Sequence, residues 1–148
     1  MKKMLKNKKG FTLVELLAVI VILAIIMVIA TQQIGKVIAG ARADSFVESY
    51  QMVAKQIQTY IISDQTVCTG NSCANDFGLS SDYALTITDM GSNTYKVKLE
   101  PGASGSKFEN LDLVTYGKNK CSAATSGTIS AGQYSADCTT TTIEGTVK

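Results

Sequence analysis

Two hydrophobic patterns follow one another along the first part of the chain. From Phe11 to Ala30 nearly every position is apolar, and as an α-helix this run would be about 30 Å long, the thickness of a bilayer's hydrocarbon core. From residue 31 to Ile62 apolar residues instead recur at steps of three and four. The pattern predicts one helix over Phe11–Ile62, membrane or filament core in 11–30 and amphipathic in 31–62.

The amphipathic half predicts a packing surface rather than a ligand groove. Lys36, Asp44, Glu48, Lys55 and Gln58 occupy its polar positions. Its apolar stripe requires a sheet to cover it. The stripe consists of Ile34, Val37, Ile38, Ala41, Tyr50, Val53, Ile57, Tyr60 and Ile61.

After Ile62 the pattern changes to loops and strands. Residues 63–82 form an irregular connection, and MGSN at 90–93 is a hairpin turn between two segments that alternate in the manner of strands. We expect strands over Tyr83–Asp89, Thr94–Glu100 and Phe108–Tyr116, and a final short strand over Thr139–Val147. The fold class is therefore α+β, a long N-terminal helix whose C-terminal half packs on a small antiparallel sheet; residues 31–62 and 63–148 form one globular head.

The charges indicate a single-pass topology. Five lysines precede the apolar run, and such a cluster stays in the cytoplasm, which leaves the C-terminal part outside: Lys2, Lys3, Lys6, Lys8 and Lys9. No A-x-A cleavage site follows the run, whereas Gly10 stands just before it. Cutting between Gly10 and Phe11 would remove residues 1–10. Five of the 14 basic residues leave with them, so nine remain against 12 acidic residues and the net charge becomes −3.

Glu15 lies four residues inside the apolar run. An ionised carboxylate in hydrocarbon costs several kcal/mol unless a partner neutralises it. The residue therefore predicts a functional contact, while the alternative is a side chain that reaches water at the head-group boundary.

The segment KKGFTLVELL, with Gly10, Phe11, Thr12 and Glu15 in this relation, resembles the class III signal of type IV pilins and pseudopilins. The resemblance implies cleavage after Gly10 by prepilin peptidase, N-methylation of Phe11 and assembly into a helical homo-oligomeric filament. It also implies an assembly platform and a partner ATPase.

A physical mechanism accompanies the resemblance. Cleavage leaves a cationic amine on Phe11, and Glu15 of a neighbouring copy could pair with it where water is excluded. Between helices in lipid such a pair sets register and direction more than affinity. Thr12 is expected to solvate the helix start, with a minor role in contact.

The chain departs from the family in its prolines. Many members have helix-bending prolines near the positions of Gln32 and Met52, but the sole proline here is Pro101. The helix is straighter, or Gly35 and Gly40 supply its weak points.

Four cysteines in a segment outside the cytoplasm favour two disulfides, for which three pairings exist. The spacing suggests Cys68 with Cys73, and Cys121 with Cys138 around a polar loop. The second pair resembles the disulfide-bounded C-terminal loop of many type IV pilins. Zinc is disfavoured because there is no histidine and no C-x-x-C spacing.

The sequence gives little support for catalysis. It lacks histidine, phosphate-binding glycine motifs and visibly paired carboxylates, so we expect no enzyme, cofactor or metal. Five lysines give the head a basic tendency, which could contact DNA but more often is a solvated sheet face: Lys96, Lys98, Lys107, Lys118 and Lys120.

Three functions remain open. The first is a major pilin, a membrane-anchored precursor that enters an extracellular filament for adhesion, motility or aggregation on host or abiotic surfaces. The second is a pseudopilin of type II secretion or competence DNA uptake, and the third is a membrane protein that never polymerises. The cysteine-bounded loop favours the first.

Overall fold

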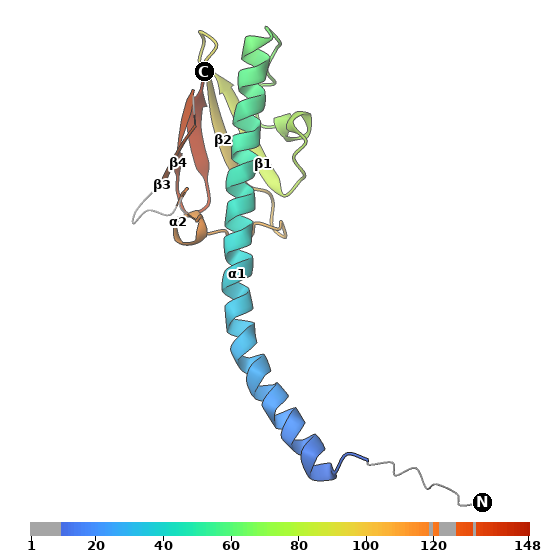
Figure 1. The fold of residues 1–148 in the computed structure, drawn as a ribbon. Coiled ribbons are helices and arrows are strands. Elements are labelled where there is room, and N and C mark those ends of the chain that lie inside the picture. The colour runs from blue at the N-terminus through green and yellow to red at the C-terminus, as the bar shows by residue number, and fades with distance from the viewer. Residues whose placement is uncertain (1–9, 119, 122–126, 132) are drawn as a thin grey trace, which may run out of the picture. The chain divides into compact units, whose positions relative to one another are not determined.

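The structure, a computed structural model, describes residues 10–118, 120–121, 127–131 and 133–148 (Figure 1). The chain divides after Lys36 into two units, and helix α1 (Leu13–Ile62) contributes to both. We describe each unit by itself.

In the first unit, α1 has no cover. Every residue from Gly10 to Lys36 is exposed, and the large apolar side chains range from 49% exposed at Val21 to 86% at Phe11. A helix satisfies its backbone hydrogen bonds internally, so this segment can keep its structure where water is excluded. The predicted helix is confirmed, with its start at Leu13 rather than Phe11.

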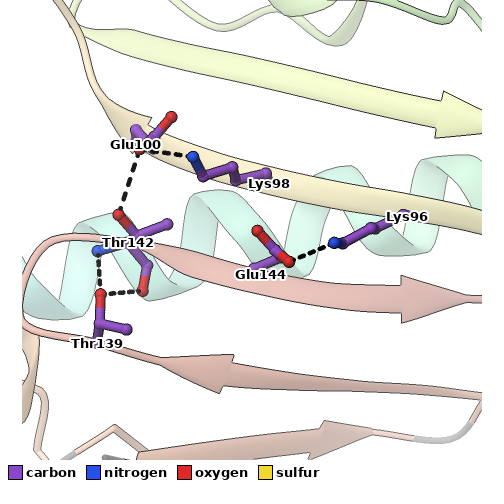
Figure 2. Close-up of polar contacts among 6 residues, drawn as sticks. All are labelled: Lys96, Lys98, Glu100, Thr139, Thr142 and Glu144. Atoms are coloured by element: carbon purple, nitrogen blue, oxygen red, sulfur yellow. Dashed lines mark hydrogen bonds and ion pairs between the residues drawn. The ribbon is translucent and has the colours of Figure 1, made fainter.

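In the second unit, α1 packs against one face of a sheet (Figures 1 and 2). One stripe of the helix is buried there: Gly40, Ala43, Phe46, Val47, Tyr50, Val53, Ala54 and Ile57. The predicted stripe was right at Tyr50, Val53 and Ile57 but wrong at its lower end, where Ile34, Val37, Ile38 and Ala41 are exposed. Periodicity identifies the apolar face of a helix, but the length of the covering sheet decides where burial begins.

The sheet is antiparallel and five-stranded, in the order β1-β2-β5-β4-β3. Its strands are β1 (Tyr83–Asp89), β2 (Tyr95–Pro101), β3 (Gly127–Ala131), β4 (Tyr134–Cys138) and β5 (Ile143–Val147). Alternate residues face the helix and complete the core: Leu85, Ile87, Val97, Leu99, Tyr134, Ala136, Cys138, Ile143 and Val147. The α+β fold class is confirmed, as is the hairpin at 90–93, where Met90 N–H donates to Thr94 O over 2.9 Å.

Two assignments after β2 were wrong. The predicted strand Phe108–Tyr116 is a loop followed by the short helix α2 (Leu113–Tyr116), because Asn110 has a left-handed φ of 60° and Asp112 caps the helix by accepting from Thr115 N–H. The predicted polar loop between the last two cysteines contains β3 and β4. Of the predicted strand 139–147, Ile143–Val147 is β5.

Two disulfides join the pairs that the spacing suggested. Cys68–Cys73 closes a short loop that leads into the 3₁₀-helix η1 (Cys73–Phe77), and Cys121–Cys138 ties the segment after α2 to the end of β4. The Cα atoms are 5.8 and 5.6 Å apart, within the usual range for disulfides.

Candidate functional site

The start of α1 is held by a reciprocal pair of side chains. Glu15 Oε2 accepts from Thr12 N–H over 2.9 Å and from the Thr12 hydroxyl over 3.0 Å, while Thr12 Oγ1 accepts from Glu15 N–H over 3.3 Å. This is the capping box, in which a threonine N-cap and a glutamate three residues later satisfy each other's backbone donors. The role predicted for Thr12, solvation of the helix start with a minor role in contact, did not include this pair, although T-x-x-E before an apolar run is its signature.

The capping box provides hydrogen bonds to the Glu15 carboxylate but does not neutralise its charge. Thr12 supplies hydrogen bonds to the carboxylate but no positive charge, and among the residues that the structure describes the Glu15 charge has no ion-pair partner. Its position in the first turn suits the positive end of the helix dipole. The backbone nitrogen and the hydroxyl oxygen of Thr12 both lie C-terminal to the Gly10–Phe11 bond, so the capping box would remain after that bond is cut.

Gly10 and Phe11 are open to solvent just before the helix. Together with Thr12 and Glu15 they line a shallow groove of about 470 Å³. A Cβ added at Gly10 would meet nothing within 4 Å. The chain itself therefore imposes no need for glycine there, and a requirement for Gly10 would come from whatever binds this segment.

The apolar run follows directly on this site. Within the described residues, α1 is the one helix long and apolar enough to cross a membrane, and its most apolar window has no buried residue. Phe11, Thr12 and Glu15 thus stand together at the beginning of an unburied apolar helix. This arrangement fits a membrane-anchored precursor.

The outer face of the sheet is polar and its charges are paired (Figure 2). Lys96 contacts Glu144 over 2.6 Å and Lys98 contacts Glu100 over 3.0 Å. The other three lysines of the basic tendency also reach carboxylates, at 3.3 Å for Lys107–Asp82, 3.1 Å for Lys118–Asp44 and 4.0 Å for Lys120–Glu48. Exposed pairs contribute little stability, but they offset the positive charge that phosphate binding would use.

One group of residues has metal-ligand types close together, namely Cys68, Cys73 and Asp76, in the part of the chain that the structure describes. Its two sulfur atoms are joined in a disulfide and offer no thiolate. The group is better explained by the Cys68–Cys73 disulfide, which closes the short loop before η1.

A family model described as the prokaryotic N-terminal methylation motif matches residues 5–31, and this range contains all four residues of the site. The comparisons with curated proteins and with solved structures gave no match. Pilin precursors with this motif are processed by prepilin peptidase and assemble into filaments. Residues 5–31 therefore carry the class III signal peptide of type IV pilins, the motif of pilin-like and pseudopilin precursors.

Proposed function

We propose that this chain is a structural subunit, a major pilin, of an extracellular type IV pilus used for adhesion, surface motility or aggregation. The observation that carries the proposal is the methylation motif over residues 5–31, which includes an apolar helical segment that the described chain leaves uncovered. Such a surface is stable in lipid, and it is equally stable against the same surface of other copies.

The proposed maturation follows from the residues at the helix start. Prepilin peptidase cuts between Gly10 and Phe11, and the new Phe11 amine is N-methylated. Glu15 of a neighbouring copy then pairs with that amine inside the filament, where leaving either charge alone would be costly. The capping box holds the carboxylate in a fixed place in the first turn, so little side-chain entropy is lost on pairing.

The proposed partners are further copies of the chain, prepilin peptidase, an assembly platform with its ATPase, and host or abiotic surfaces. The paired lysines of the head give no reason to add nucleic acid. A pseudopilin of type II secretion or competence DNA uptake is the alternative. The Cys121–Cys138 disulfide favours the pilus subunit.

The test is the fate of the Gly10–Phe11 bond. Mass spectrometry of sheared surface filaments should find a chain that begins at methylated Phe11. The Gly10→Val variant should accumulate as uncut precursor and give no filaments, although its helix and head fold normally. Abundant filaments from wild-type cells support a pilus subunit; a mature chain confined to the membrane supports a pseudopilin, and an uncut wild-type chain contradicts both.

A further inference from the structure

A groove opens on the second unit between α1 and the loop that follows β2. Its volume is about 380 Å³, and we call it the base groove: it is lined by Ile38, Ala41, Arg42, Ser45, Lys107 and Phe108. Its floor is apolar and its rim carries two cations. A mixed surface of this kind suits a partner that presents an apolar side chain next to a carboxylate.

The loop side of the groove is firmly held. Asp82 accepts from Lys107 N–H over 3.0 Å, and this hydrogen bond, followed by those from Ser80 and the nearby Lys107 charge, holds the pKa of the Asp82 carboxyl below its ordinary value. The Phe108 ring lies 4.7 Å from the Tyr83 ring and 5.2 Å from the Phe46 ring, centroid to centroid. The groove is therefore a preformed feature of the core.

No side chain in the described part of the chain fills this groove. Ile38 is 46% exposed, and Arg42 has no carboxylate within ion-pair distance in the described part of the chain. Lys107 contacts Asp82 but its side chain remains 80% exposed. Both cations are thus available to an outside carboxylate.

The hairpin between β1 and β2 presents the complementary chemistry. Met90 is 61% exposed. Among the described residues beyond Ile62 it is the only large apolar residue that is exposed to solvent. Asp89 precedes it and accepts from Gly91 N–H over 2.7 Å, while Thr94 N–H donates to Gly91 O over 3.1 Å. These bonds fix the turn, so Met90 and the Asp89 charge project from a rigid support.

The groove and the hairpin lie at opposite ends of the sheet. At one end of β1 Tyr83 pairs with Pro101, next to the loop that holds the groove, and at the other end Asp89 pairs with Tyr95. Seven strand residues separate these ends by about 20 Å. Tyr95 also pairs with Val147, next to the C-terminus. The C-terminus marked in Figure 1 therefore shows the end of the sheet at which the hairpin lies. Complementary surfaces at opposite ends can join copies head to tail, and the result is an open filament when the rotation between copies does not close a ring.

We propose that the base groove of one copy receives the β1–β2 hairpin of another copy, a contact that deepens the proposed filament function and rests on it. Met90 packs over Ile38 and Ala41, because an unbranched side chain adapts to an irregular apolar floor. Asp89 faces Arg42 and Lys107. The contact is heterologous and repeats along the filament, in addition to any contact made by the apolar helices.

Cross-linking in intact filaments tests the contact. The full-length double variant Met90→Cys with Ser45→Cys should give a ladder of disulfide-linked multimers after mild oxidation and denaturing electrophoresis. Each single variant, and Thr88→Cys paired with Ser45→Cys, should remain monomeric. A ladder in the Thr88 control, or none in the test pair while filaments are abundant, overturns the proposal and leaves the filament function standing.

Charge exchange gives an independent measurement. Arg42→Glu should lower the yield of sheared filaments roughly tenfold, since it places a negative charge opposite Asp89. Asp89→Lys in the same chain should restore most of the yield. Lys55→Glu, on another face of α1, is the matched control and should have little effect. If Arg42→Glu alters only attachment to an anionic surface, the groove binds an external partner and the proposal is wrong; if wild-type cells make no filaments, the proposed function fails with it.

Discussion

The two halves of α1 have the same backbone structure and opposite surroundings. Between Leu13 and Ile29 large apolar side chains occur on all sides and every one is exposed, whereas between Gly40 and Ile57 one stripe is buried under the sheet. The second half gains its stability from its own chain. Within the described residues the first half is not covered by its own chain, and on the proposed function its cover comes from lipid and then from other copies.

This difference predicts that substitutions separate into two classes. Changes in the first half should alter processing and assembly while the head unfolds as before. Changes in the second half should alter the free energy of unfolding. The predictions below test that separation, from the largest expected effect to the smallest.

The charge at Glu15 should have the largest effect. Glu15→Gln keeps the capping box, because glutamine also accepts at this position, but it removes the charge. Breaking a buried ion pair costs about 3 to 5 kcal/mol, so we expect filament yield to fall roughly a hundredfold or more while cleavage and head melting stay normal. Electron microscopy of sheared filaments measures the yield, and mass spectrometry measures cleavage.

The capping box provides the matched control for this experiment. Thr12→Ala removes the two hydrogen bonds of the box that use the Thr12 hydroxyl and leaves the charge, at a cost of about 1 kcal/mol in helix stability. Its filament yield should fall far less than that of Glu15→Gln. The reverse order would mean that Glu15 acts through the helix start of its own chain, which would contradict the pairing between copies.

The sequence was sufficient where local chemistry decides the structure. The residues Gly10, Phe11, Thr12 and Glu15 were selected from the motif, and the helix followed from its periodicity. The bonds between Thr12 and Glu15 also follow from local sequence, because T-x-x-E before an apolar run is the capping-box pattern. How Glu15 pairs in a filament stays a prediction.

The sequence was insufficient where tertiary contacts decide. Leu111 and Leu113 alternate like strand residues, yet the left-handed Asn110 and the Asp112 cap turn that segment into a loop and a short helix. Apart from Tyr134, strand β4 holds small and polar residues with weak strand preference, and its pairing with β5 places it in the sheet. Propensity carries no information about such pairing.

Removing the Cys121–Cys138 disulfide should have the largest effect on the head. Cys121→Ser with Cys138→Ser frees a loop of sequence separation 17, and we expect the free energy of unfolding to fall by about 2 to 5 kcal/mol. Chemical denaturation of the full chain in detergent, followed by near-ultraviolet circular dichroism, measures it. The same change at Cys68 and Cys73, with a separation of 5, should cost less. Equal losses would contradict the loop-length explanation.

Two glycines give a matched comparison between the head and the exposed first half of α1. A Cβ at Gly145 in β5 would lie 2.6 Å from Ala136 Cα in β4, whereas one at Gly35 in α1 would meet nothing within 4 Å. Gly145→Ala should therefore destabilise the head by about 1 to 3 kcal/mol through overpacking. Gly35→Ala should leave head melting unchanged and favour the helix slightly. Thermal melts of both variants measure the stability of the head. A lower melting temperature of the head in Gly35→Ala would show that the first half of α1 and the head are not independent.

The smallest effect is expected at Tyr50, which is fully buried under the sheet. Its hydroxyl has no hydrogen-bond partner among the described residues, so Tyr50→Phe should leave stability unchanged or raise it by up to about 1 kcal/mol at neutral pH. Burial, together with the nearby Tyr134 and Glu144, raises the pKa of the Tyr50 hydroxyl.

The raised pKa also fixes the sign of a pH effect at Tyr50. The folded chain binds the phenolic proton more tightly than the unfolded chain, so the stability from neutral Tyr50 is fully present below about pH 10 and is lost as the pH rises toward the folded value. Tyr50→Phe should therefore flatten the loss of stability above about pH 10, measured by denaturation across that range. Tyr116→Phe, at a half-buried position, controls for the loss of one hydroxyl. If both variants have the same alkaline profile as the wild type, burial of Tyr50 does not govern the head's stability at high pH.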